Sequence, residues 1–169
     1  MSRPVAYNFR NCQSLFGYAT DVHRRSGGRC QLCGCGSTPI NFDLWRQMTV
    51  EHLIGKSQGG YLRQVRESVS KRFSDMPSQE QESLAKAIDA LNTVTACSFC
   101  NSTTSRDACP VSMTELIAST AGGPDDLRAK LGEELGKVLA RKREDVAWKL
   151  RSVRAAFQQE FPAVGASGA

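Results

Sequence analysis

The chain has 169 residues and contains no long hydrophobic run. A membrane-spanning helix needs roughly 18 or more consecutive apolar residues, and no stretch of this sequence approaches that length. The first seven residues also lack the basic and then apolar layout of a secretory signal peptide. Apolar residues nevertheless make up 40% of the chain, which favours a folded globular protein. We therefore expect a cytoplasmic protein that has no membrane partner.

Histidine is scarce in this sequence, with two residues, whereas cysteine is abundant, with seven. A disulfide framework is not expected in a reducing compartment, and an odd number of cysteines argues against complete pairing. Close pairs of cysteines in an intracellular protein are instead typical of metal binding. The cysteines are therefore the first candidates for a site.

Lysine and arginine outnumber the acidic residues most strongly in the N-terminal part of the chain. Residues 1–72 hold 11 Lys and Arg against 4 Asp and Glu, residues 73–123 hold 2 against 6, and residues 124–169 hold 9 against 7. A positive first segment suits a polyanionic partner such as nucleic acid. Many solvated surfaces are also mildly basic, so charge alone leaves the partner open.

Two C-x2-C pairs stand 63 residues apart, Cys30 with Cys33 and Cys97 with Cys100. A two-residue spacing lets both sulfurs of a tight turn face one ion, and two such turns complete the four-thiolate shell of a structural zinc site. This shell is closed to water and substrate, so we expect the Zn²⁺ to be structural.

Two alternatives stay open for the cysteines. The pairs could be buried free thiols or a redox pair, and Cys35 could compete with Cys33 for one position in the zinc shell. Spacing favours Cys30 and Cys33. We treat Cys12, Cys35 and Cys109 as ordinary small residues, because nothing in the sequence pairs them.

The rest of the chain has mainly helical patterns. Glycines, prolines and turn residues divide it into segments, and Met48–Val50 is interpreted as a short strand. Helices are predicted at about Cys12–Arg25, Tyr61–Phe73, Ser78–Leu91, Ser112–Ala121 and Asp125–Phe161.

The last predicted helix has an apolar stripe at steps of three and four residues, which runs from Leu127 to Leu139 and resumes at Leu150. Lys142 and Asp145 interrupt both coiled-coil registers, so we do not predict a coiled coil. The segment either packs on its own domain or forms the interface of a homodimer.

Glu51 and His52 are adjacent at the end of the predicted strand and precede a glycine-rich turn. Because four cysteines complete the zinc shell, His52 is free to accept a proton from water, with an ordinary pKa of about 6.5. The Glu51 carboxylate can hold a hard cation such as Mg²⁺. Neighbouring side chains on a regular strand point to opposite faces, so both serve one site only if the backbone turns there. His23, next to Arg24 and Arg25, is predicted to lie on a solvated helix face.

The order of these motifs resembles that of the zinc-containing HNH endonucleases. The matching residues lie within residues 29–106, under half of the chain, and are Cys30, Cys33, Glu51, His52, Gly59, Gly60, Asn92, Cys97, Cys100 and Asn101. The resemblance implies an α+β fold. Its small ββα-metal core has two short antiparallel strands followed by a helix around one catalytic metal. The cysteine spacing and the helical patterns add a four-cysteine zinc knot, surrounding helices and a long C-terminal helical segment.

The same resemblance implies a role for each polar residue of the motif. His52 is expected to be the general base that activates water for attack on a phosphodiester. Glu51 and Asn101 are expected to ligate one catalytic Mg²⁺ or another divalent cation. Asn92 is expected to brace the loop after the strand and to orient His52 through a hydrogen bond.

The sequence departs from the family pattern at its phosphate contacts. The family often has a lysine three residues after the last motif asparagine, but this position is Thr104. Glu51 also stands where many members have Asp, a change that keeps the carboxylate. We expect other basic residues to contact phosphate or DNA. The candidates are Lys56, Arg106, Arg29 and Arg63.

The connector that precedes Asn92 is longer than the short one usual in the family, with 31 residues after the Gly-Gly pair. We interpret residues 61–91 as an inserted helical pair that serves either substrate choice or the fold. The expected domains are an HNH nuclease domain at residues 1–123, with its core at 29–106, and a C-terminal helical segment at residues 124–169.

These features predict a metal-dependent DNA endonuclease, of the kind found in restriction or phage systems, that hydrolyses phosphodiester bonds of double-stranded DNA. The alternative is a non-catalytic zinc-knuckle module that binds nucleic acid or a partner protein. Such a module would bind in a salt-dependent manner without cleavage. Double-strand cleavage at a palindrome would require two active sites and hence a homodimer.

Overall fold

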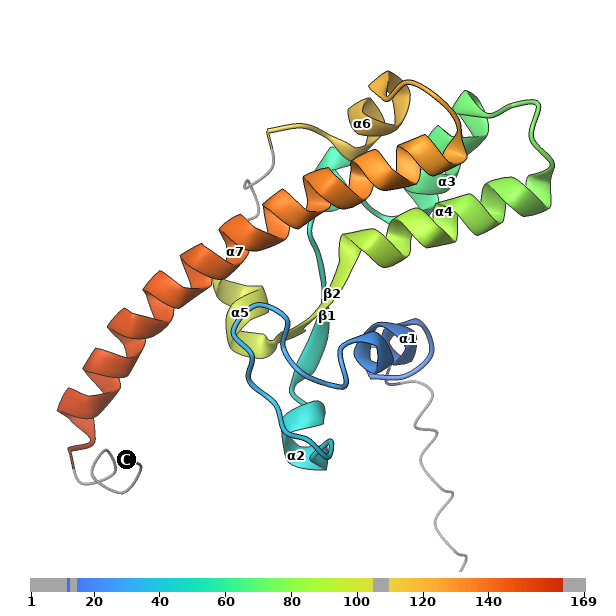
Figure 1. Cartoon of the computed structure of the whole chain (residues 1–169). Helices are drawn as coiled ribbons and strands as arrows, with labels where there is room; N and C mark the ends of the chain where they lie inside the picture. Colours follow the sequence, from blue (N-terminus) through green and yellow to red (C-terminus); the bar gives the residue numbers. More distant parts are fainter. Residues whose placement is uncertain (1–11, 13–14, 105–109, 163–169) are drawn as a thin grey trace, which may run out of the picture.

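The structure is a computed structural model that describes residues 12, 15–104 and 110–162. It combines a small two-stranded sheet with helices (Figure 1). The predicted helices are present, although α1 begins at Tyr18 and not at Cys12, and part of that predicted span (residues 13 and 14) is outside the described residues. In chain order the elements are α1 (Tyr18–Arg25), α2 (Phe42–Trp45), β1 (Met48–His52), η2 (Lys56–Gln58), α3 (Leu62–Arg72), α4 (Ser78–Asn92), β2 (Thr93–Cys97), α5 (Ser98–Thr103), α6 (Met113–Ser119) and α7 (Pro124–Glu160).

The sheet joins two segments that are far apart in the sequence. β1 pairs with β2 in antiparallel register, from Met48 opposite Cys97 to His52 opposite Thr93. α4 leads directly into β2, and α5 follows β2 without a break at Ser98. The chain therefore forms the two antiparallel strands and the following helix that the sequence predicts, with α3 and α4 in the connection between the strands.

Four helices surround the main apolar core. α3 packs on α4 and α6, and α4 packs on the first part of α7. The fully buried members of this core include Ile54, Val65, Val69, Ala85, Ile88, Met113, Leu127 and Leu131. The predicted inserted pair, α3 and α4, is thus a principal part of the core and not a peripheral addition.

A second, smaller apolar cluster lies around the cysteine pairs. It contains Cys30, Leu32, Met48, Ala96, Cys100 and Val146. Val146 belongs to α7, and Leu139 of the same helix packs against both clusters. α7 therefore joins the helical core to the cysteine-rich part of the molecule.

α7 begins with Pro124 after the cap residue Gly123, whose N–H donates to Asp126 Oδ2 at 2.9 Å. Its buried face carries Leu127, Leu131, Leu135, Val138, Lys142 and Val146. Leu150 still packs against the second cluster, but every residue from 151 to 160 is exposed, and Figure 1 shows the end of the helix extending away from the rest of the molecule. Phe157 is 46% exposed. Within the described residues, neither α7 nor another helix has an apolar stretch long enough to cross a bilayer.

α1 lies against the sheet, and this packing overturns one prediction. α1 contacts both β1 and β2, and its inner face buries Ala19, Val22 and His23. His23 is 2% exposed, and its Nδ1 lies 3.0 Å from Thr95 Oγ1 of β2. The prediction of a solvated His23 is wrong, because the sheet covers the face of α1 that carries this residue.

The unequal burial along α7 predicts unequal effects of two substitutions. Leu131 is fully buried, so Leu131→Ala should lower the free energy of unfolding by about 2–5 kcal/mol. Phe157 lies on the exposed end of α7, so Phe157→Ala should change the free energy of unfolding by no more than about 0.5 kcal/mol. Urea denaturation followed by circular dichroism measures both values. Equal losses would mean that the end of α7 is covered in solution.

Candidate metal centre and active site

The four predicted zinc ligands come together in the fold. The sulfur atoms of Cys30, Cys33, Cys97 and Cys100 all lie within 4.8 Å of one another, and none of these cysteines is in a disulfide. Four thiols at this separation match the closed shell of a structural zinc site, so the cluster can hold one Zn²⁺. Cys35, the competing residue, is exposed and is not one of these four, although its thiol hydrogen-bonds with the thiols of Cys97 and Cys33.

Hydrogen bonding among the thiols favours a thiolate in this cluster. The thiols of Cys100 and Cys97 donate to the Cys30 sulfur and hold the pKa of Cys30 well below its ordinary range. The same interaction raises the pKa of Cys100. Because the thiolate is the form that binds metal, the cluster is chemically suited to a metal ion.

The first cysteine turn is attached to both the sheet and α7. The Gln31 backbone N–H donates to Thr95 O at 2.8 Å, and the Thr95 N–H donates to Gln31 Oε1 at 3.1 Å. Arg143 Nε of α7 donates to Gln31 O at 2.7 Å. Because Cys97 ends β2 and Cys100 lies in α5, a bound zinc would fix the junction between strand and helix.

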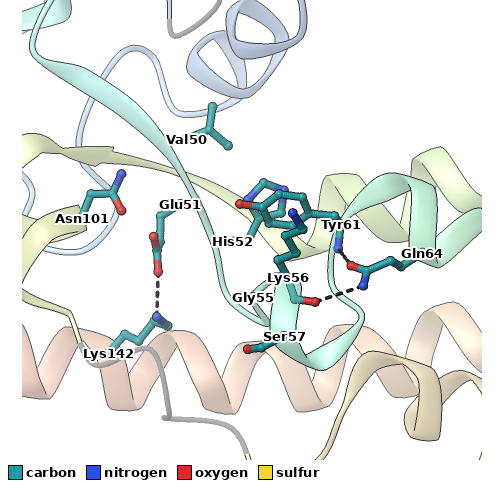
Figure 2. Close-up of a pocket in the computed structure, with 10 residues that line it drawn as sticks. All are labelled: Val50, Glu51, His52, Gly55, Lys56, Ser57, Tyr61, Gln64, Asn101 and Lys142. Carbon is teal, nitrogen blue, oxygen red and sulfur yellow. Dashed lines mark hydrogen bonds and ion pairs between the residues drawn. The ribbon is translucent and has the colours of Figure 1, made fainter.

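A cavity of about 770 Å³ opens beside the sheet (Figure 2). It lies at the end of β1. Its wall is completed by the loop after β1, by the start of α3, and by one residue each of α5 and α7. The lining residues are Val50, Glu51, His52, Gly55, Lys56, Ser57, Tyr61, Gln64, Asn101 and Lys142. The cavity thus brings together three of the four predicted catalytic residues, Glu51, His52 and Asn101.

Glu51 and His52 reach this cavity in different directions. β1 continues through both residues, so their side chains leave opposite sides of the strand. Figure 2 shows Glu51 directed toward α7 and His52 directed toward Tyr61. The predicted backbone turn is absent, because β1 runs regularly through both residues, but the cavity borders both side chains.

Glu51 shares its part of the cavity with Asn101 and Lys142. Glu51 Oε1 lies 2.8 Å from Lys142 Nζ, and the two side chains are 15% and 3% exposed. Asn101 Nδ2 donates to Thr49 Oγ1 at 2.8 Å, which leaves the amide oxygen as the atom that can bind a cation. Carboxylate and amide oxygens suit a hard divalent cation. The donor set therefore fits such an ion, with an ammonium group already paired to Glu51.

His52 is half-buried at the other side of the cavity. Its ring stacks on Tyr61, with ring centroids 4.4 Å apart and planes at 28°. Burial lowers the pKa of His52, while the negative charges of Asp89 and Glu51 act in the opposite direction. A lowered pKa keeps the imidazole neutral at pH 7, and the neutral imidazole can accept a proton.

Asn92 is fully buried and braces the loop that follows β1. Its Oδ1 accepts from Ile54 N at 2.8 Å, and its Nδ2 donates to the carbonyls of Ile54 and Gly60 at 3.0 and 2.9 Å. A Cβ on Gly60 would lie 1.7 Å from Ile54 O, so this close approach requires glycine. The amide braces the loop, as the sequence predicts, but its hydrogen bonds go to the loop backbone and not to the His52 ring, to which the resemblance assigned one. Asn92 therefore holds the loop that follows His52.

The predicted phosphate contacts lie at different places. Lys56 lines the cavity. Arg63 is exposed on α3, in an ion pair within that helix. Arg29 donates to a backbone carbonyl of the first cysteine turn. Arg106 and Cys109 lie outside the described residues.

Thr104, the residue at the family's lysine position, has a structural contact. It is 7% exposed, and its hydroxyl donates to the carbonyl oxygen of Cys100. It therefore caps the end of α5 and does not offer a phosphate contact. A positive charge near Glu51 comes instead from Lys142 of α7.

Lys142, Tyr61 and Asp89 belong to the surroundings of the site but were not selected from the sequence. Lys142 does leave a signal, because it interrupts an apolar stripe. Asp89 Oδ2 accepts from the Tyr18 hydroxyl at 2.8 Å, and burial raises the pKa of Asp89. Neither Tyr61 nor Asp89 has such a signal, because their positions near His52 depend on how α3 and α4 pack.

Comparison with protein-family models, curated proteins and solved structures gave no match. The resemblance to HNH endonucleases therefore rests on the residues and geometry described above. The structure itself establishes a mixed fold of helices and a small sheet, with four cysteines placed to hold a metal ion.

The cysteine cluster predicts one tightly bound zinc per chain. Cys97→Ser should remove this zinc and lower the thermal unfolding temperature strongly, because a structural zinc contributes directly to folding. Elemental analysis of the purified protein and differential scanning calorimetry measure the two effects. Cys35→Ser is the matched control and should retain zinc, since the other four sulfurs already complete a four-thiolate shell without Cys35. Zinc retained in Cys97→Ser would refute the assignment.

The hydrogen bonds of Asn92 predict a large loss of stability when its amide is removed. Asn92→Ala leaves three buried backbone groups of Ile54 and Gly60 without this partner, and each unpaired group costs about 1–3 kcal/mol. Chemical denaturation should therefore show a loss of at least about 3 kcal/mol. Asn101→Ala, which alters an amide at the cavity wall, should cost less. An Asn92→Ala protein as stable as wild type would contradict the bracing role.

Proposed function

We propose that the protein is a metal-dependent DNA endonuclease of the HNH type. The observation that carries the proposal is the meeting of His52, Glu51 and Asn101 in one cavity, on two antiparallel strands and the helix that follows them. The four-cysteine cluster lies at the other end of the same strands, where zinc is proposed to hold β2 and α5 together.

In the proposed reaction, His52 accepts a proton from a water molecule. The water oxygen forms a bond to the phosphorus of a phosphodiester while the bond to the leaving 3′-oxygen breaks. Glu51 and Asn101 would hold a divalent cation such as Mg²⁺, which when bound would supply charge neutralisation for the phosphate and the leaving oxygen. Tyr61 maintains the ring plane of His52, and Asn92 holds the loop that follows it.

The charge of the surroundings supports a nucleic-acid substrate. Residues 141–154 of α7 contain six Lys and Arg but two Asp and Glu, and of the six only Lys142 is buried. Lys56 adds a basic side chain to the cavity wall. Phosphate groups are attracted to such a surface in a salt-dependent manner. We propose double-stranded DNA as the substrate, and a homodimer through the exposed end of α7 if both strands are cut together.

A second candidate function is a zinc-knuckle module that binds nucleic acid or a partner protein without cleaving. The ion pair between Glu51 and Lys142 favours it, because an ammonium group already satisfies the carboxylate that a catalytic cation requires. The lowered pKa of the half-buried His52 favours catalysis over this module, since a neutral imidazole can accept a proton from water but attracts phosphate less than a charged one would.

Cleavage of supercoiled plasmid tests the proposed function. The zinc-loaded protein should nick or cut the plasmid with Mg²⁺, Mn²⁺ or Ni²⁺, and EDTA should stop the reaction. His52→Ala should slow cleavage by at least about 100-fold, the usual contribution of a general base. Its zinc content and unfolding temperature should remain those of the wild type.

Cleavage by His52→Ala at the wild-type rate would rule out His52 as the base. Salt-sensitive retention of DNA without cleavage in any of the three metals would favour the second candidate function instead.

A further inference from the structure

Lys142 is a charged residue on the buried face of α7. It is 3% exposed and lies between Val138 and Val146, which are also buried. An ammonium group in such a position is costly unless an opposite charge compensates it. This burial distinguishes Lys142 from the other lysines and arginines of α7 that form ion pairs, which are partly exposed.

The compensating charge comes from Glu51, at a separation of 91 residues in the sequence. Lys142 Nζ donates to Glu51 Oε1 at 2.8 Å, and the Glu51 side chain is 15% exposed. Figure 2 shows the ammonium group meeting Glu51 from the side of α7. The pair therefore joins α7 to β1 at the wall of the cavity.

Glu51 is also the carboxylate that the proposed function assigns to the divalent cation. Lys142 donates to Glu51 Oε1, so a cation that binds through both carboxylate oxygens would need the oxygen that the ammonium group now contacts. A divalent cation at Glu51 would lie close to a second positive charge in a partly buried site, where repulsion is less screened than in water. Both positive groups therefore compete for one carboxylate.

We propose that Lys142 is an exchangeable counter-cation of Glu51. It neutralises the carboxylate in the absence of a divalent ion and gives up this contact when the ion binds. The inference rests on the proposed function for the assignment of Glu51 as a metal ligand. Its consequence is that metal affinity is set partly by α7, a helix that supplies none of the proposed ligands.

Mn²⁺ binding to the zinc-loaded, full-length protein tests this exchange without DNA. Free Mn²⁺ is measured by electron paramagnetic resonance for the wild type, Lys142→Met and Lys142→Arg. Lys142→Met keeps an unbranched side chain without the charge. It should bind Mn²⁺ more tightly, by about tenfold, because the buried positive charge that repels the ion and occupies Glu51 is gone. Lys142→Arg keeps the charge and should retain the wild-type affinity.

The double variant Glu51→Gln/Lys142→Met should lose the added affinity, which would locate the gain at Glu51. Calorimetric unfolding and zinc content verify that each variant is folded. Unchanged or weaker Mn²⁺ binding by Lys142→Met would overturn the exchange, as would equal tightening in Lys142→Arg or tightening that persists in the double variant.

Plasmid cleavage by the same proteins separates this inference from the proposed function. A wild type that cleaves no DNA, together with tighter Mn²⁺ binding in Lys142→Met, refutes the nuclease but retains the exchange. A wild type that cleaves DNA, together with unchanged Mn²⁺ binding in Lys142→Met, retains the nuclease and refutes the exchange.

Discussion

The contact among four sulfur atoms is the constraint on which the geometry of the site depends. Cys30 and Cys33 come from an irregular loop, whereas Cys97 ends a strand and Cys100 lies in a short helix. A two-stranded sheet of this size has little stability by itself. A metal ion bound by this cluster would hold the loop, the strand and the helix together at one point. The same junction positions α5, and with it Asn101, which lines the cavity together with Glu51.

The local motifs of the site were predictable from the sequence, because each is contained in a few consecutive residues. The cysteine pairs, the Glu51-His52 pair and the strand that carries it appear where the sequence predicted them. The long helix α7 was also predictable, since its apolar stripe recurs along more than half of its length. What these motifs could not specify is which surfaces meet, because that depends on packing between distant segments.

The missed features all result from such packing. His23 looked solvated because its neighbours are charged, but the sheet covers it. Lys142 looked like a break in a pattern, but its position is explained by Glu51 across the interface between α7 and β1. Residues 61–91 were interpreted as a helical pair for either substrate choice or the fold, and only the packing shows that α3 and α4 supply much of the main core. A close approach such as that of Gly60 to Ile54 likewise becomes apparent only in three dimensions.

One helix carries both a large part of the main core and the charge next to Glu51, which makes the length of that helix significant. Leu131 and Lys142 are separated by about three helical turns, so they lie on the same face. One residue inserted between them would rotate the rest of α7 by about 100° relative to the core. The ammonium group would then leave Glu51 although every side chain was retained. This interval of the chain should therefore tolerate changes of residue type far better than changes of length.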